Sequence, residues 1–532
     1  MEQMSTIILN LSDRWGKKYL EKNKCIYLYN FMEENWFLDD YESIRNNKLP
    51  YIYIENVDDD KINYIEISTG LVRAVPIFYK LVRDKIYVSD NIDKLLSEKS
   101  KVSYNSLKEF LVFSYVLGEK TLFNETKQVQ AGEVLKCRVG STPVKEQYFI
   151  YDGGEEFDVG KSELLQEFER VLYKTFELYA EKLRKKKIIV PLSGGYDSRL
   201  IVTMFKEFGL TDVICVSYGV KGNFETKKAS LVAQKLGYPL DVVVYKTDDY
   251  FSLVDSDDGI NYLDYSSQKS SLGHLQEYLM MKYLKEKYSF SPEDVVFVPG
   301  HTGDFVTGSH IPYNFLNGRV SIETLKELIF KKHSLRRTKD YTLLDGYDFK
   351  LSEPYKNFEY FDWRERQAKF IANANRNYDY NGYSWAMPYW FNDYVLFWCK
   401  VPLIYKYQKN LYDEYLEEVI FKKYGINFDK EERQKVRQRE NNRFYLKMRQ
   451  VMKRNNLVRK IYKKVRRDHN PIGIDAIGDT LLEIAKAKFP TGNKMLISIV
   501  EKEYGSTRVN SNAHLTDCYL SKILEECGID EL

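Results

Sequence analysis

Residues 188–202 limit the fold of this chain more than any other segment. Residues 188–192 read Ile-Ile-Val-Pro-Leu, the next three read Ser-Gly-Gly, and an amphipathic stretch begins at Tyr196. This order predicts a buried strand, a glycine turn and the start of a helix. Successive backbone N–H groups in such a turn form a concave donor surface at the positive end of the helix. The segment is therefore suited to binding a polyphosphate.

The side chains of this turn add a requirement for a cation. Ser193 and Ser198 can donate hydroxyl hydrogen bonds to phosphate oxygens. Asp197 repels a bare polyphosphate unless a cation such as Mg²⁺ lies between them. We therefore expect a nucleotide with Mg²⁺ here, although a glycine turn between a strand and a helix can also be purely structural. The expected nucleotide-binding residues of this turn are Leu192, Ser193, Gly194, Gly195, Asp197 and Ser198.

Strand and helix patterns alternate through the middle of the chain. Strands are expected at 188–192, 213–217, 240–245 and 295–298, with helices to about residue 208 and over 226–236. This alternation predicts βαβ units and a parallel sheet. Ligands of such sheets lie at the carboxyl ends of the strands. Val216 and Ser217 on the second strand, and Gly300 after the fourth, are therefore expected beside the nucleotide.

A second glycine turn, residues 299–304, follows the strand 295–298 and ends at Asp304. A carboxylate at this end of the sheet can share the Mg²⁺ with Asp197. The alternative is that Asp304 caps the next turn, because aspartate is common in turns. Asp197 and Asp304 are the expected metal ligands.

The composition is that of a folded protein. The 532 residues are 44% hydrophobic and 15% aromatic, which is enough for two or three domains. The six cysteines form no Cys-x-x-Cys pair, so neither a zinc site nor a disulfide framework is indicated. The sequence has no signal-peptide pattern and no apolar run of membrane length, so we expect a cytoplasmic protein.

One basic segment differs from the rest of the chain. Residues 430–467 contain 16 Lys or Arg and three Glu, interspersed with apolar residues. A pair of basic amphipathic helices there fits a phosphorylated acceptor or the inner surface of a membrane. Nucleic acid is the other polyanion to consider, although a net charge of +3 predicts no specific nucleic-acid partner. A solvated helical cover is the alternative.

These segments together resemble the asparagine synthetase and β-lactam synthetase family, in the superfamily of PP-loop ATP pyrophosphatases. The resemblance is carried by the turn 193–198, the strand end 216–219 and the turn 300–304, with weaker support at 70–79, 86–90 and 131–135. It covers about residues 60–415. It implies ATP and Mg²⁺ as cofactors and a reaction in which a carboxylate is adenylated and then passed to an amine.

The resemblance also implies an α/β fold in three parts. Residues 1–152, where short β-rich runs alternate with turns, correspond to a class II glutamine amidotransferase-like domain of Ntn type. Residues 153–425 correspond to the parallel-sheet synthetase domain, beginning after a Gly153-Gly154 hinge with a helix over 161–185. Residues 426–532 form a helical, basic C-terminal extension.

The first of these parts departs from the family. Glutamine-dependent members carry a cysteine directly after the initiator Met, whose thiol attacks glutamine, whereas Glu2 stands there in this sequence. Fewer residues than usual also precede Gly70. We therefore expect a degenerate glutaminase scaffold that does not hydrolyse glutamine.

The predicted reaction centre departs from the family as well. His301 stands three residues before Asp304, where the two named enzymes carry glutamate or tyrosine. Its imidazole can accept the amine's proton near neutral pH, or it can simply bind the backbone or a phosphate. The family's Glu-x-Arg-x-Pro stretch corresponds to Ser-Trp-Ala-Met-Pro at 384–388, so aspartate is not the expected substrate.

Lys409 lies where the family carries a lysine that meets the charge developing on the acyl-adenylate. Three lysines lie close together here, Lys400, Lys406 and Lys409, and an exposed helix lysine is the alternative identity of each. His301 and Lys409 are the expected catalytic residues.

Three functions fit these patterns. The first is an ATP-dependent ligase that joins a carboxylate to ammonia or an amine, with amidation of a sugar acid in a bacterial surface polysaccharide as the favoured case. A peptide or small-molecule cyclase of the β-lactam or lasso-peptide type is a variant of it. The second is a tRNA-modifying PP-loop enzyme, disfavoured because thiolation needs paired cysteines. The third is an ATP-binding scaffold without catalysis. A homodimer is compatible with all three.

Overall fold

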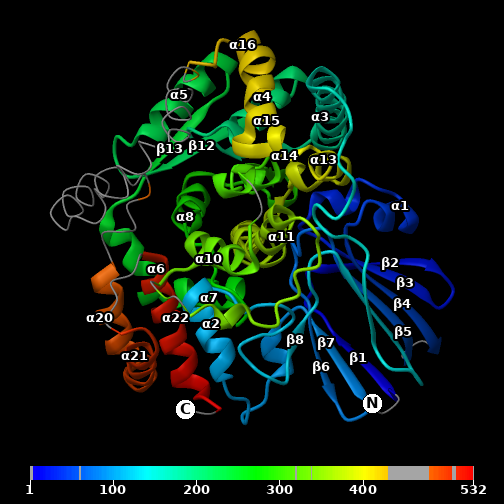
Figure 1. Ribbon diagram of the computed structural model, residues 1–532, viewed down its shortest axis with the longest axis vertical. Coiled ribbons are helices and arrows are strands. Elements are labelled where there is room, and N and C mark those ends of the chain that lie inside the picture. Colours follow the sequence, from blue (N-terminus) through cyan, green and yellow to red (C-terminus); the bar gives the residue numbers. More distant parts are fainter. Residues whose placement is uncertain are drawn as a thin grey trace.

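The computed structural model describes residues 4–58, 61–317, 320–336, 338, 340–428, 430, 472, 478–505 and 511–530. The prediction for the basic segment 430–467 therefore falls outside the described residues, apart from Lys430. In Figure 1 the N-terminal strands lie at the lower right, the parallel sheet lies towards the top, and the C-terminal helices lie at the lower left. The described chain is thus a mixed α/β fold with a β-rich N-terminal region and a helical C-terminal part.

Two sheets make up the N-terminal region, and they pack together where β1 contacts β5. The four-stranded sheet has the order β1-β7-β6-β8: β1 (Thr6–Asn10), β7 (Lys85–Ser89), β6 (Phe78–Val82) and β8 (Lys127–Gln128). The six-stranded sheet has the order β10-β9-β5-β4-β3-β2: β10 (Val144–Gln147), β9 (Glu133–Arg138), β5 (Lys61–Thr69), β4 (Pro50–Asp58), β3 (Lys24–Tyr29) and β2 (Trp15–Glu21). The short β-rich runs that the sequence predicts in this region are confirmed as strands.

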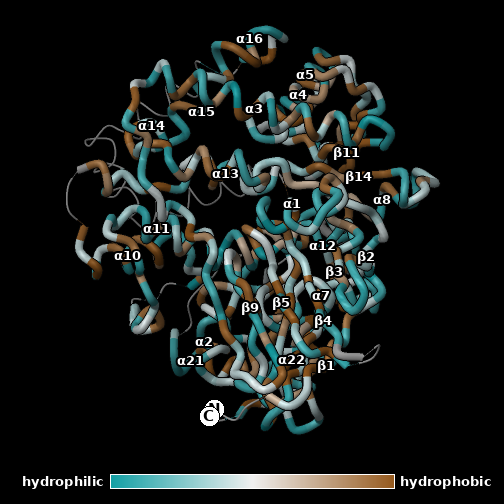
Figure 2. The backbone as a smooth tube through the Cα atoms, turned by 90° about the vertical axis from the view of Figure 1, so that its right-hand side faces the viewer, coloured by the Kyte–Doolittle hydropathy of each residue, from teal (hydrophilic) through white to brown (hydrophobic). Residues whose placement is uncertain are grey.

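The third sheet is parallel and has the order β13-β12-β11-β14-β15. Its strands are β11 (Lys187–Pro191), β12 (Val213–Gly219), β13 (Leu240–Val244), β14 (Val295–Phe297) and β15 (Ser384–Trp385). Residues 188–191 of β11 and all of β14 are apolar and buried, and Figure 2 shows the hydrophobic colour of these central strands. Such runs are typical of strands that are covered on both faces. The chain runs outward from β11 through β12 to β13 and then crosses to β14, so the strand order reverses between β11 and β14. Ligands of open parallel sheets bind at such a reversal.

Helices surround this sheet. Those before and between its first strands are α3 (Lys161–Leu183), α4 (Tyr196–Glu207) and α5 (Phe224–Leu236), of which α4 and α5 contact β11 and β12. The other α-helices are α1 (Tyr41–Asn46), α2 (Tyr104–Phe113), α6 (Ser252–Asp255), α7 (Asp257–Ser267), α8 (Tyr278–Lys287), α9 (Gly303–Val306), α10 (Ile322–His333), α11 (Pro354–Phe361), α12 (Arg376–Tyr380), α13 (Asn392–Trp398), α14 (Leu403–Lys406), α15 (Asn410–Tyr415), α16 (Phe421–Lys423), α20 (Gly478–Lys488), α21 (Pro490–Tyr504) and α22 (Ser511–Cys527). Two π-helical segments are η7 (Asp362–Ile371) and η11 (Leu416–Ile420). None of the helices in the described ranges is long and apolar enough to cross a membrane.

Buried polar contacts join the N-terminal region to the parallel sheet. The backbone N–H of Trp385 on β15 donates to the Phe31 carbonyl at 2.8 Å. Glu34 is 1% exposed and accepts hydrogen bonds through Oε1 from the Tyr179 hydroxyl and the Met387 N–H. Its Oε2 atom is buried with no hydrogen-bond partner among the described residues. Burial therefore raises the pKa of Glu34 to about 7.

This buried carboxyl predicts a pH dependence of stability. Because an unfolded glutamate titrates near ~4.3, the folded chain binds more protons than the unfolded chain between that pH and about 7. Stability contributed by Glu34 is then present at low pH and is lost as the pH rises to 7. We expect Glu34→Gln, which cannot ionise, to unfold in urea like the wild type at pH 4.5 and to be more stable by about 3 kcal/mol at pH 8. Glu181→Gln, at a 72% exposed carboxylate on α3, is the control, and an equal difference at both pH values contradicts the assignment.

Candidate functional site

The predicted nucleotide residues meet at one edge of the parallel sheet. Since β11 lies between β12 and β14, the loops that follow these strands are neighbours. The N–H of Leu192 donates to the Val216 carbonyl at 2.7 Å, which holds the glycine turn against β12. The Ser217 hydroxyl donates to Thr226 Oγ1 on α5 at 3.2 Å. Leu192, Val216 and Ser217 thus lie close together at this edge of the sheet.

Hydroxyl groups brace the glycine turn from within. The backbone N–H of Ser193 donates to Ser198 Oγ at 3.1 Å, and the N–H of Gly195 donates to Ser193 Oγ at 3.1 Å. The two serine hydroxyls lie 3.2 Å apart. Gly195 is the N-cap of α4 and has no capping side chain. The turn therefore leads directly into the positive end of a twelve-residue helix, where an anion is stabilised.

The second glycine turn packs against the first turn of α4 so closely that side chains are excluded. A Cβ at Gly300 would lie 2.7 Å from the Ser198 backbone N, and a Cβ at Gly303 would lie 2.8 Å from the Asp197 Cγ. Both positions require glycine for this contact. The two turns, which are separated by about 100 residues in the sequence, therefore form one surface.

Lys409 joins the carboxylates of the two turns. Its Nζ atom lies 2.8 Å from Asp197 Oδ1 and 2.7 Å from Asp304 Oδ1. Lys409 is 5% exposed, whereas the Asp304 side chain is 63% exposed. Burial raises the pKa of Asp197, while the ammonium of Lys409 holds the pKa of Asp304 below its usual range. Asp197, Asp304 and Lys409 are thus brought together, as their predicted roles require.

The local backbone explains how a lysine reaches this buried position. Gln408 and Lys409 both have left-handed backbone conformations, with φ of 53° and 62°, between α14 and α15. Such residues cluster at functional sites because the surrounding structure must hold them. The neighbouring Lys406 is committed elsewhere, to Asp152 and Glu359, and Lys400 is exposed. The alternative of an exposed helix lysine is therefore wrong for Lys409.

The two aspartates suit Mg²⁺ together with a nucleotide. Mg²⁺ in nucleotide sites is held by one or two carboxylates plus substrate phosphates, and the exposed Asp304 leaves one side of the pair open. Within the described ranges of the chain, no group of three or more His, Cys, Asp or Glu side chains could hold a metal by itself. A cation at this site would accordingly depend on phosphate oxygens for the rest of its ligands.

His301 has an acidic partner that the sequence did not indicate. Its Nε2 atom lies 2.9 Å from Glu277 Oε1, and Glu277 also accepts from the hydroxyls of Tyr378 at 2.5 Å and Tyr218 at 3.1 Å. Glu277 is 1% exposed, and burial raises its pKa to about 7. Burial lowers the pKa of His301 to about 4, so the imidazole is neutral at pH 7. Glu277 precedes α8 in a segment with no recognisable motif, so no sequence signal pointed to it.

The segment 384–388, which corresponds to the family's Glu-x-Arg-x-Pro stretch, has a structural role in this chain. Its strand β15 pairs with β14, and Trp385 is fully buried. Beyond it, the Tyr389 hydroxyl donates to the Asp197 carbonyl at 2.6 Å. Residues 384–389 therefore pack against the glycine turn 193–198, but they contribute no carboxylate or guanidinium group to the site.

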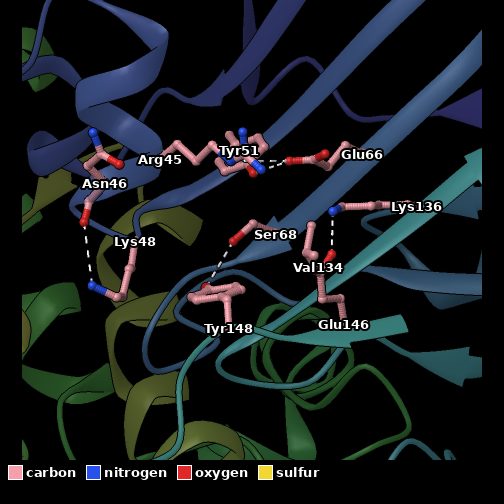
Figure 3. A pocket seen from close by; sticks show the side chains of 10 residues that line it. All are labelled: Arg45, Asn46, Lys48, Tyr51, Glu66, Ser68, Val134, Lys136, Glu146 and Tyr148. Atoms are coloured by element: carbon pink, nitrogen blue, oxygen red, sulfur yellow. Dashed lines mark hydrogen bonds and ion pairs between the residues drawn. The ribbon is translucent and has the colours of Figure 1, made fainter. Parts of the chain in front are cut away.

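A separate pocket of about 340 Å³ lies on the six-stranded sheet. Figure 3 shows Tyr51 and Arg45 directed toward Glu66, and Lys136 directed toward Glu146. Arg45 is paired with Glu66 and Lys136 with Glu146, whereas Lys48 donates to Asn392. None of the predicted site residues lines the pocket. The pocket is therefore distinct from the nucleotide site.

Comparison with known families agrees with this geometry. The structure defines a parallel α/β fold whose two glycine turns converge on a pair of aspartates and a lysine. A protein-family model described as asparagine synthase matches residues 183–461, just over half of the chain, and the chain belongs to that family. No curated protein sequence matches it significantly. Family membership supports an ATP-dependent, amide-forming ligase in general.

Proposed function

We propose that this protein is an AMP-forming carboxylate–amine ligase with its reaction centre at the two glycine turns. The observation that carries the proposal is the contact of Lys409 with both Asp197 and Asp304, because it unites the polyphosphate turn with the predicted catalytic lysine. Mg²⁺ bound by the two aspartates would offset the charge of the phosphates. Lys409 would meet the negative charge that develops as the acyl-adenylate forms and breaks down.

The reaction has two balanced steps. An oxygen of the substrate carboxylate bonds to the α-phosphorus of ATP, and the bond from that phosphorus to pyrophosphate breaks. The nitrogen of ammonia or another amine then bonds to the acyl carbon, and the carbon–oxygen bond to AMP breaks. The nitrogen must lose a proton in this second step.

We assign His301 as the general base that accepts this proton. Glu277 binds its Nε2 atom and thereby fixes the ring. The Nδ1 atom has no hydrogen-bond partner among the residues that the structure describes, and the side chain is 13% exposed. The neutral imidazole can therefore accept the proton of the amine at Nδ1. Glu277 is a positioning residue in this account.

Glutamine is not the nitrogen source in our proposal. A nucleophilic cysteine is exposed and has a lowered pKa, whereas burial raises the pKa of all six thiols here. The N-terminal sheets would then be a glutaminase-like Ntn domain that serves as a scaffold, within the domain limits 1–152, 153–425 and 426–532. A sugar acid of a bacterial surface polysaccharide is the first acceptor to test in this proposal.

The cytoplasmic location, the homodimer and the role of the basic segment 430–467 remain predictions.

Nucleotide binding tests the proposal first. We expect calorimetric titration with a non-hydrolysable ATP analogue to show Mg²⁺-dependent binding to the wild type. Asp197→Ala and Asp304→Ala each remove that Mg²⁺ dependence, because each deletes one of the two carboxylates. Gly154→Ala, at an exposed glycine with no atom within 4 Å of an added Cβ, is the control. Absence of binding to the wild type contradicts the ligase and favours a scaffold role that does not depend on ATP.

Replacement of His301 separates the two steps. We expect His301→Ala to lower amide formation about 100-fold, the usual contribution of a general base, while carboxylate-dependent ATP–pyrophosphate exchange stays within about threefold. Glu277→Gln keeps a hydrogen-bonding group at the same place and is expected to lower amide formation less than His301→Ala. Loss of both reactions in His301→Ala shows that the histidine binds ATP or phosphate instead.

A further inference from the structure

The π-helix η7 carries an unusual number of buried charges beside the proposed reaction centre. Its Arg364 donates to Glu133 at 3.1 Å and to Gln130 at 2.9 Å. Its Lys369 bonds to Glu365 at 2.5 Å and to two carbonyls. These charges are matched in pairs, as buried charges must be. Widened helical turns of this kind occur frequently at functional sites.

Arg366 on the same helix is the exception. Its side chain is half-buried and makes no hydrogen bond or ion pair with any residue that the structure describes. The carboxylate of Asp362 lies within electrostatic range of Arg366, but both of its oxygens are used. Asp362 Oδ2 bonds to His310 Nδ1 at 2.6 Å, and Oδ1 accepts from Gln367 at 2.8 Å. The N–H donors of the guanidinium are therefore not used by any described residue, although the side chain is half-buried.

The neighbours of Arg366 connect it to the reaction centre. Phe370, about one turn after Arg366 on η7, places its ring 5.6 Å from that of His274, whose ring lies 5.8 Å from that of His301. His274 Nδ1 is buried without a hydrogen-bond partner among the described residues. About one turn before Arg366, Asp362 binds His310, whose ring lies 6.0 Å from that of Phe305, the residue after Asp304. Arg366 thus lies on η7 between Phe370, which reaches His301 through His274, and Asp362, which binds His310.

Arg366 is not among the main electrostatic partners of the two aspartates at the proposed ATP site. The strongest electrostatic partners of Asp197 and Asp304 are Lys409 and each other, together with His310 for Asp304. The buried histidines beside Arg366 are neutral, since burial lowers the pKa of both His274 and His333 to about 3. Arg366 thus carries its positive charge beside two neutral histidines, with the carboxylate of Asp362 and the ammonium of Lys332 as its charged neighbours. A planar guanidinium of this kind binds a carboxylate or phosphate in a bidentate manner.

We propose that Arg366, assisted by His274, binds a second anionic group of the acceptor, a carboxylate or a phosphate separate from the carboxylate that reacts. The inference rests on the proposed function and names its substrate class: acids that carry two anionic groups. The first group reacts with ATP at the glycine turns, and the second is held at η7. A sugar acid that is also phosphorylated and a simple dicarboxylic acid both meet this requirement.

Matched pairs of acids test the proposal. ATP–pyrophosphate exchange is measured with butyrate against succinate, and with glucuronic acid against glucuronic acid 1-phosphate. We expect the acid with two anions to give at least a tenfold higher kcat/KM in one of the pairs. Arg366→Ala lowers that value about 10- to 100-fold, the range for a charged hydrogen-bonded contact, and leaves the single-anion acid within threefold. Arg170→Ala, at a 61% exposed arginine on α3, is the charge-matched control.

Chemical protection gives a readout that does not depend on turnover. Phenylglyoxal modifies accessible arginines, and peptide mass analysis follows Arg366. With Mg²⁺ and a non-hydrolysable ATP analogue present, we expect succinate or glucuronic acid 1-phosphate to protect Arg366 at least fivefold better than butyrate or glucuronic acid. Protection by the phosphorylated sugar alone identifies phosphate as the second anion, and protection by succinate identifies carboxylate.

The outcomes separate the inference from the proposed function. Exchange that is equal within each pair, or that falls equally for both members in Arg366→Ala, overturns the inference and leaves the ligase in place. Absence of exchange with every acid counts against the ligase, and selective protection of Arg366 then still supports the second-anion site. Absence of both exchange and protection overturns both.

Discussion

Lys409→Met is expected to lower carboxylate-dependent ATP–pyrophosphate exchange by about 100-fold or more. The reason is that Lys409 is the cation shared by Asp197 and Asp304, and it is fixed there by a left-handed backbone. Methionine fills the same volume without the charge. The Asp197 carboxylate then stays buried without its counter-charge, which costs about 3–5 kcal/mol of stability. The measurement is exchange at saturating ATP, with far-UV circular dichroism to confirm that the variant is folded.

Lys400→Met is the matched control for this variant. The substitution is identical and lies nine residues upstream on an exposed side chain. We expect its exchange rate to equal that of the wild type. If Lys409→Met is folded and retains exchange within threefold, the proposed role of the lysine is wrong.

Gly300→Ala is expected to weaken binding of the ATP analogue at least tenfold. An added Cβ would lie 2.7 Å from the Ser198 N and 3.1 Å from the Ser198 Cα, both backbone atoms of the first turn of α4. Backbone atoms cannot rotate away, so the two glycine turns must separate. Overpacking of this kind also costs about 1–3 kcal/mol of stability. Calorimetric titration measures the affinity directly.

The comparison for Gly300→Ala is Gly160→Ala. Gly160 precedes α3, and an added Cβ there has no neighbour within 4 Å. We expect the dissociation constant of this control to be unchanged. A Gly300→Ala variant that binds the analogue within twofold of the wild type contradicts the view that the two turns form one surface.

Much of the parallel sheet could be predicted from the sequence. Strands buried on both faces, such as β11 and β14, contain apolar runs that lead into glycine turns, and this pattern has few other interpretations. The N-terminal strands β1 and β2 were not predicted. β2 carries three charged residues and is largely exposed at the edge of its sheet. A strand of this kind has no apolar face to reveal it.

The candidate site was predictable where a motif fixes a residue to a strand end. This holds for Ser193, Asp197 and Asp304, because the carboxyl ends of adjacent parallel strands must meet. Lys409 was ambiguous among three nearby lysines, since its burial depends on the left-handed turn at 408–409. Glu277 and Arg366 could not be assigned at all. Their importance comes from which partners lie beside them in space, and sequence spacing does not contain that information.

Transfer of ¹⁸O from the substrate carboxylate to AMP tests the central claim most directly. The acid from the paired panel that best supports exchange is labelled in its carboxyl group and incubated with the protein, ATP, Mg²⁺ and ammonia. The proposed reaction predicts AMP that carries one ¹⁸O atom, because the oxygen that attacks the α-phosphorus leaves with AMP. Unlabelled AMP, or ADP with label in inorganic phosphate, contradicts the proposal that this protein adenylates a carboxylate.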